Sequence, residues 1–215
     1  MSFTYGTLKT AIQDYLESSE TSFVDNLDTF IQQSEERIFK LVQLPEQRKN
    51  VTGNVSTSNR FLSTPTDYYA PFSLAVIDSG VYHYLEFKHP SFSKQFQTSE
   101  SATGRPRYYT QFDNDSFEVI PVPDSNYSVE LHYLHKPNSL TAGSDSGTTF
   151  LSTEYPDALL YGSLVEGATY LKEPQADIVN FENRFKEAIL RAKNLSEGRL
   201  TRDEYRYDSL RSNVT

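Results

Sequence analysis

The most regular hydrophobic pattern of the chain lies near its C-terminal end. Between Pro174 and Gly198, apolar residues recur at spacings of 3, 4, 3, 4 and 3, and the positions between them are mostly polar or charged. This is the period of an amphipathic helix with a single buried face. The pattern predicts a helix that ends at Gly198. The predicted bundle seam on this helix consists of Ile178, Phe181, Phe185, Ala188, Ala192 and Leu195.

A second helix is predicted directly before it, over residues 155–172. Pro156 suits the first helical position, where a missing N–H costs nothing, and Asp157 places a carboxylate at the positive end of the helix dipole. Gly162 and Gly167 lower helix propensity, which is easiest to explain if another backbone packs closely against them. One apolar face is expected, formed by Leu160, Leu164, Ala168 and Leu171.

Two more helices are predicted at the N-terminal end of the chain. The first covers residues 7–17, with Thr7 as a possible N-cap, and the second runs from about Phe23 to Val42 before Pro45 ends it. In the second helix the residues expected to face inward are Leu27, Phe30, Ile31, Ser34, Ile38 and Leu41. Those expected to face outward are Asp25, Asp28, Glu35, Arg37 and Lys40.

Between these helical regions the hydrophobic period changes to two. Short runs rich in Val, Tyr, Phe and Thr alternate with turn residues, as is typical of antiparallel hairpins. A helical turn is expected from His89-Pro90 to Phe96, and 97–106 is expected to be a loop. The predicted strands are 48–55, 60–62, 72–77, 82–87, 107–112, 117–122 and 127–136.

The predicted fold is therefore α+β, with the helices from both ends of the chain forming an approximately four-helix bundle and an antiparallel β-sheet or small barrel inserted between them. The expected parts are N-terminal bundle helices (1–46), a β lobe (47–137), a flexible loop (138–150), a C-terminal helical hairpin (151–197) and a C-terminal arm (198–215).

Composition narrows the function classes. The chain has no cysteine, so disulfides and thiolate metal sites are excluded, and its first residues contain no apolar run that would indicate a secretory signal or a membrane span. The formal net charge of −9 argues against sequence-independent nucleic-acid binding, which requires clustered Lys and Arg. Tyrosine (15) and phenylalanine (14) are abundant, which favours contact surfaces.

No catalytic or cofactor motif is found. His132 and His135 are three apart on a predicted strand, so they face opposite sides and are poor metal co-ligands. Asp113-Asn114-Asp115 begins like a calcium loop but lacks the glycine and glutamate that follow in such loops, so a turn is the better interpretation. A glycosidase carboxylate pair leaves no local motif and stays an open alternative. We expect no enzyme activity, no cofactor and no metal.

The C-terminal arm has no face wide enough for a hydrophobic core. Its arginines alternate with acidic residues and a few apolar or aromatic ones. The arm is interpreted either as a frayed tail or as a segment that orders on a partner, with its aromatic residues and leucine as anchors and its arginines as carboxylate clamps. The residues proposed for that partner contact are Arg199, Arg202, Tyr205, Arg206, Tyr207, Leu210 and Arg211.

Several segments, in their order along the chain, resemble the head-to-tail connector (adaptor, or head-completion) proteins of tailed bacteriophages. The resemblance covers essentially the whole chain and includes a Thr-Gly-x-Pro-x-Tyr-Tyr motif at 103–109. The segments that carry it are YGTLKTAIQDYL, DTFIQQSEERIFK with LVQLPEQRKNVTG, FLSTPTDYYAPFSL, TGRPRYYTQFDNDSFEVIPVPDSNYSVELHYLHKP, YPDALLYGSLVEGATYLK and FKEAILRAKNLSEGR.

The resemblance implies a structural virion protein of the neck, assembled in the host cytoplasm. Such a protein binds the portal protein as a ring of about twelve copies, extends the DNA channel without binding DNA specifically, and presents a surface to a tail or nozzle protein. The arm would then bind the portal. A competing hypothesis from a different class is a tail-associated glycan- or receptor-binding module that uses the tyrosine-rich sheet. A glycan binder would not need the helical hairpin and the arm.

Overall fold

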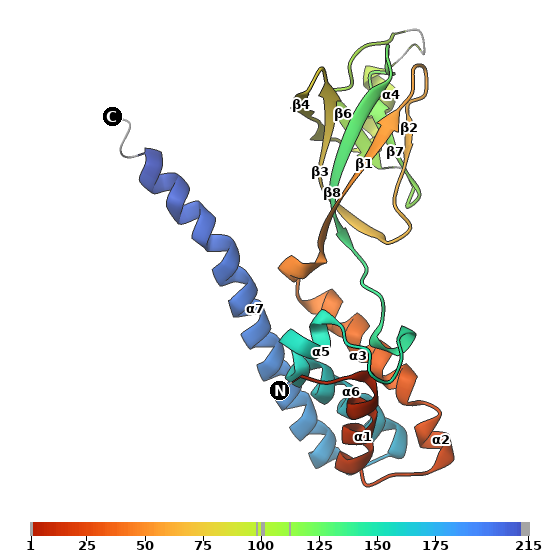
Figure 1. Ribbon diagram of the computed structural model, residues 1–215, viewed down its shortest axis with the longest axis vertical. Helices are drawn as coiled ribbons and strands as arrows, with labels where there is room; N and C mark the ends of the chain where they lie inside the picture. Colours follow the sequence, from red (N-terminus) through yellow and green to blue (C-terminus); the bar gives the residue numbers. More distant parts are fainter. Residues whose placement is uncertain (1, 98, 100–101, 112, 212–215) are drawn as a thin grey trace. The chain divides into compact units, whose positions relative to one another are not determined.

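The computed structural model of the protein describes residues 2–97, 99, 102–111 and 113–211, with side-chain surroundings as far as Gly198 (Figure 1). The fold is α+β. The chain forms two compact units. Unit 1 consists of Met1–Glu46 and Asn138–Thr215, and unit 2 consists of Gln47–Pro137. The β-rich unit 2 is thus inserted into the helical unit 1.

Unit 1 begins with a helix whose start differs from the prediction by a few residues. Helix α1 is capped by Thr4, and Thr7, the predicted cap, is the third helical residue and completes a capping box with it. The predicted second helix is two helices, because the chain breaks its helical path at Asp25 and Asn26. The elements are α1 (Tyr5–Tyr15), α2 (Thr21–Val24), α3 (Leu27–Leu41), η1 (Pro45–Gln47), η2 (Leu140–Ala142), α5 (Phe150–Glu154), α6 (Pro156–Leu171) and α7 (Gln175–Arg211).

The predicted hairpin of two C-terminal helices is present, but the four-helix bundle is not confirmed. Helix α6 is the centre of unit 1, and α1, α3 and α7 all pack against it. Leu159 and Leu164 are fully buried on different sides of α6, so this helix is apolar around most of its circumference, not on one face as predicted. In a bundle of four equivalent helices around one shared core, each helix would keep a solvated side. Helix α6 is instead a central helix that the others surround.

The two predicted close approaches on α6 are made by side chains and not by a neighbouring backbone. A Cβ atom added at Gly162 would lie 2.1 Å from Ser34 Oγ of α3 and 3.0 Å from Phe185 Cε2 of α7. A Cβ atom at Gly167 would lie 2.7 Å from Leu16 Cδ1. These two glycines let the neighbouring helices reach the α6 backbone.

The loop predicted to be flexible, 138–150, is attached to unit 1 at several points. Leu140 is buried, and its backbone N–H donates to Glu35 Oε1 over 2.9 Å. The backbone N–H of Gly6 donates to the carbonyl of Asp145 over 2.8 Å, and Lys9 Nζ lies 2.8 Å from Asp145 Oδ1. Such contacts argue against mobility of this segment.

Unit 2 contains two four-stranded sheets and no barrel among its described residues. The first sheet has the order β1-β8-β3-β4 and is antiparallel throughout, and the second has the order β2-β7-β6-β5, in which β5 and β6 are parallel. The strands are β1 (Arg48–Val55), β2 (Phe61–Ser63), β3 (Tyr68–Asp78), β4 (Val81–Tyr84), β5 (Glu86–Phe87), β6 (Tyr108–Gln111), β7 (Ser116–Ile120) and β8 (Tyr127–His135).

The two sheets of unit 2 share one apolar core. Leu74 and Val76 from the first sheet and Tyr109, Phe117 and Val119 from the second belong to the same buried cluster. Helix α4 (Pro90–Phe96), capped by the His89 ring, contacts β6 of the second sheet. Rings of α4 pack edge-on against a ring of β6, with centroid distances of 5.1 Å and 5.5 Å. The predicted helical turn at 89–96 is confirmed as this helix.

Candidate interaction surfaces

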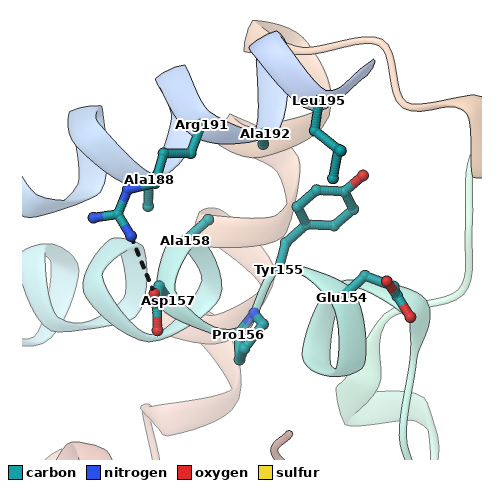
Figure 2. Close-up of a pocket in the computed structure, with 9 residues that line it drawn as sticks. All are labelled: Glu154, Tyr155, Pro156, Asp157, Ala158, Ala188, Arg191, Ala192 and Leu195. Atoms are coloured by element: carbon teal, nitrogen blue, oxygen red, sulfur yellow. Dashed lines mark ion pairs between the residues drawn. The ribbon is translucent and has the colours of Figure 1, made fainter. Parts of the chain in front are cut away.

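A shallow groove lies on unit 1 where α6 begins beside α7 (Figure 2). Its volume is about 170 Å³. Its apolar walls come from small side chains on both helices, with Tyr155 at one end. The lining residues are Glu154, Tyr155, Pro156, Asp157, Ala158, Ala188, Arg191, Ala192 and Leu195.

The chemistry of this groove suits one apolar side chain of a partner better than a small molecule. Arg191 on its rim lies 3.7 Å from Asp157 (Figure 2) and 3.0 Å from Glu187, so its guanidinium already has two carboxylate partners. Small-molecule sites usually enclose roughly 300–1,000 Å³ and contain unpaired polar groups. The sequence analysis did not predict this groove. The available signal was three small residues, Ala158, Ala188 and Ala192, where the two predicted helices meet.

The predicted bundle seam on α7 lies partly in the core. Phe185, Ala188 and Ala192 are buried, and Ile178 and Phe181 are partly buried against the same cluster. Leu195 differs, since it is 48 % exposed and lines the groove instead. The buried line continues at Ser196, whose hydroxyl donates to the backbone carbonyl of Gln43 over 2.8 Å.

The prediction that this helix ends at Gly198 is wrong. Helix α7 continues to Arg211, and Figure 1 shows it extending past the other helices of unit 1. Nothing lies within 4 Å of a Cβ atom placed at Gly198, so this glycine serves no close packing within the described residues. The described part of the arm, 198–211, therefore has a helical backbone. The proposed contact side chains fall outside the side chains that the structure describes: Arg199, Arg202, Tyr205, Arg206, Tyr207, Leu210 and Arg211.

Several charged side chains on α3 and α7 have partners within the chain. Arg37 Nη2 lies 2.6 Å from Glu182 Oε1, and its guanidinium also lies 4.5 Å from the centre of the Phe185 ring. Arg184 donates to the Tyr161 hydroxyl over 3.0 Å, and Lys186 lies 3.5 Å from Glu182. Arg37 thus connects α3 to α7, Arg184 connects α7 to α6, and the pair of Lys186 with Glu182 lies within α7.

Glu35 contradicts the prediction most clearly, because it is only 4 % exposed. Burial raises the pKa of its carboxyl, and hydrogen bonds from Ser139 and the Leu140 backbone partly oppose that shift. Leu41, expected to face inward, is 53 % exposed. Helical spacing alone assigned Glu35 to the wrong side, because the chain segment 138–142 covers the side of α3 that carries it.

The exposed aromatic residues of unit 2 form a second surface. Tyr82 and Tyr84 on the edge strand β4 are 50 % and 67 % exposed. Phe72 is also exposed, and the Arg48 guanidinium lies 4.9 Å from the centre of its ring. A groove of about 310 Å³ beside this pair is lined by Arg48, Lys49, Asn50, Phe72, His132 and Tyr133.

The histidines and the acidic turn have structural partners. His83 Nε2 lies 3.1 Å from Arg105, His132 lies 3.4 Å from Glu130, and His135 Nδ1 lies 2.8 Å from the Gln47 carbonyl. Asp113 Oδ1 accepts hydrogen bonds from the backbone N–H groups two and three residues later, as in an Asx turn. Within the described part of the chain, no three His, Cys, Asp or Glu side chains are grouped as metal ligands.

Comparison with known protein families bears on the two function classes. The family model of the SU10 adaptor protein matches residues 3–212, almost the whole chain. The chain belongs to the SU10 adaptor protein family. The resemblance to head-to-tail adaptors of tailed phages is thereby confirmed. No curated protein matches this adaptor. None of its described helices combines the length and the apolar character that a membrane span requires.

Proposed function

We propose that this phage adaptor protein binds beneath the portal as a ring of about twelve copies, extends the DNA channel and provides the attachment surface for a tail or nozzle protein in the virion neck. The observation that carries the proposal is helix α7. Its 37 residues correspond to about 55 Å of α-helix, yet its last buried side chain among those described is Ser196. A helix that continues beyond its own core gains stability by packing against another protein.

The arm is the part of α7 proposed to bind the portal. It carries four arginines within 13 residues, and arginine forms bidentate pairs with carboxylates. Among the exposed side chains on the packed part of α7, Arg191 and Lys186 already pair with carboxylates of their own chain. The portal contact is therefore assigned to the arginines of the arm and not to these paired side chains.

Removal of 199–215 tests the portal contact. We expect the truncated protein to melt at nearly the same temperature as the full chain but to lose co-sedimentation with the portal protein. Full chains in which the four arm arginines are replaced by lysine, or alternatively by glutamate, provide a matched pair. Lysine should weaken binding and glutamate should abolish it, because lysine keeps the charge without the bidentate geometry. A large loss of melting temperature on truncation would show instead that the arm belongs to the core.

Ring formation is expected only on the portal. The exposed ion pairs of unit 1 are satisfied within one protomer, so contacts between subunits start from modest surfaces worth about 0–1 kcal/mol for each exposed pair. Neighbours held on a portal gain effective concentration. Light scattering should therefore report monomers or a weak mixture in isolation and a closed ring with portal added. A tight dimer through residues 155–195 in dilute solution would contradict this.

Two further properties are part of the proposal. The net charge of −9 lets DNA pass through the channel without adhering, so no band shift with duplex DNA is expected even at low salt.

The protein is also proposed to have no hydrolase activity. A screen of glycosides, esters and peptides would test this, and turnover that disappears on changing one carboxylate to its amide would refute it. Binding to a glycan by the isolated protein would favour the competing receptor-binding function.

A further inference from the structure

The first sheet of unit 2 has two edge strands that run in opposite directions. The first sheet has the order β1-β8-β3-β4, so β1 and β4 form its two edges. Each neighbouring pair in this sheet is antiparallel. With three antiparallel steps between them, β1 and β4 must point opposite ways. Within the described residues, neither strand has a backbone hydrogen bond on its outer side.

Strand direction then determines how copies could join. A rotation about a ring axis keeps the direction of each strand relative to that axis, so β4 of one copy and β1 of the next would meet antiparallel. The antiparallel alternation of strands would then continue from the sheet of one copy into the sheet of the next. A sheet with an odd number of alternating strands would meet its neighbour in the parallel sense instead.

The side chains at the two edges are complementary. Residues directly opposite one another in a ladder share a face, so Tyr82 and Tyr84 lie on the same face as Ile77 and Ala75. This is the face opposite the core residues Leu74 and Val76. On the same face, β1 presents small polar side chains, including Asn50 and Thr52, which oppose His132 and Glu130 of β8. Two exposed tyrosines can lie over such small neighbours without a clash.

The charged side chains near the two edges favour one alignment of β4 with β1 of the next copy. Arg48, at the start of β1, contacts Phe72 but has no carboxylate partner among the described residues. Glu86, the first residue of β5, has a side chain that is 67 % exposed and already lies 2.7 Å from Lys88 Nζ. When Tyr84 of one copy is opposite Asn50 of the next, Tyr82 is opposite Thr52 and Arg48 reaches the level of Glu86, where it would be a second cation beside that carboxylate. This alignment also shifts each copy by two residues, as the tilted strands of a closed sheet require.

We infer that β4 of one protomer pairs antiparallel with β1 of the next, in the alignment Tyr84 with Asn50, so that the first sheet of unit 2 continues between neighbouring copies of this chain. The inference rests on the proposed ring and names the surfaces that form it. It also accounts for an eight-residue edge strand whose outer backbone groups have no hydrogen-bond partner among the described residues, which in a lone protein is an aggregation hazard.

Disulfide cross-linking tests the alignment without background, because the chain contains no cysteine. Asn50→Cys with Tyr84→Cys in one full-length chain, assembled on portal and oxidised, should give a ladder of cross-linked multimers on a non-reducing gel. Each single variant should remain uncross-linked, and a mixture of the two should stop at dimers. Thr52→Cys with Tyr82→Cys is a second pair in the same alignment and should also give a ladder.

A matched control places the cysteines on opposite faces. Val51→Cys with Tyr84→Cys keeps both strands but turns one thiol away, so no ladder is expected. A ring on portal without a ladder from either in-register pair would overturn the inference and leave the proposed function intact. Cross-linking of the single variants would also overturn it, because β1 would then pair with β1 or β4 with β4. If the unmodified protein forms no ring, both proposals fail.

Discussion

Ser196 of α7 donates a 2.8 Å hydrogen bond to the backbone carbonyl of Gln43, three residues before the point where the chain leaves unit 1. Ser196 is 3 % exposed and lies two residues before Gly198. Val42 and Leu44, on either side of Gln43, are also buried. One part-buried hydrogen bond therefore joins the segment of α7 just before the arm to the segment just before the exit toward unit 2.

Replacement of Ser196 by alanine is expected to lower the free energy of unfolding by about 1–2 kcal/mol, because the Gln43 carbonyl loses a buried donor. Chemical denaturation would measure it. Asn194→Ala, at an exposed position of the same helix, is the matched control and should change stability by less than about 0.5 kcal/mol. Equal stability of both variants would show that the hydrogen bond contributes nothing.

The glycines of α6 and α7 should respond oppositely to alanine. Gly162→Ala places a methyl group 2.1 Å from Ser34 Oγ and is expected to cost about 1–3 kcal/mol through overpacking. Gly198→Ala meets open space inside a helix, so it should stabilise α7 by up to about 1 kcal/mol. Thermal melting and helical circular dichroism would measure both. A neutral Gly162→Ala would mean that α3 and α6 separate at little cost.

Glu35 makes stability depend on pH in a defined direction. Burial raises its pKa above the ordinary 4.5, so the folded protein binds a proton more tightly than the unfolded chain. Its contribution is present in full below pH 4.5 and is lost as the pH rises through the higher folded value. Glu35→Gln keeps an acceptor for the Leu140 N–H but cannot ionise. The variant should therefore lose less stability than wild type between pH 4 and 7.

The control for this titration is the neighbouring Glu36, whose side chain is 56 % exposed and paired with Lys40. Glu36→Gln should leave the pH dependence of wild-type stability nearly unchanged. Denaturation midpoints at a series of pH values would compare the three proteins. Identical curves for wild type and Glu35→Gln would contradict the assigned burial.

Arg37 and Glu182 should be coupled in the isolated protomer. A double-mutant cycle with Arg37→Ala and Glu182→Ala is expected to give a coupling energy of about 0.5–1 kcal/mol, because the pair is only partly exposed and Arg37 also covers the Phe185 ring. Lys186→Ala, whose ammonium lies 3.5 Å from the same carboxylate, should couple more weakly. Coupling that appears only in portal-bound rings would assign these charges to subunit contacts after all.

The sequence predicted local structure well where one periodic signal dominated. Strand β1 occupies Arg48–Val55 as expected, and the α6–α7 hairpin is present, because alternation and the proline boundaries act locally. The errors have tertiary causes. Helix α6 contacts three helices, so the prediction of a single apolar face was wrong. Glu35 is buried by a segment about 105 positions away in the sequence. Helix α7 continues through Gly198 because a glycine in a helix costs only about 1 kcal/mol.

The candidate surfaces were less accessible to sequence reasoning. The tyrosine content indicated contact surfaces, but only strand order shows that Tyr82 and Tyr84 lie at a sheet edge opposite in direction to β1. Which charges remain free for a partner also depends on distances across the fold. Arg37 and Glu182 are separated by 145 positions and still form a pair at 2.6 Å.

The insertion of unit 2 has an evolutionary consequence. Arg48 pairs with Leu134 in the β1–β8 ladder, and His135 contacts the Gln47 carbonyl, so the chain enters and leaves this unit through neighbouring residues. A module with adjacent ends can be lost, enlarged or exchanged by recombination while the helices from both termini keep their packing. Selection can then act on the inserted module separately from the helices that carry the arm. One helical scaffold could in this way carry different inserted modules in different adaptors.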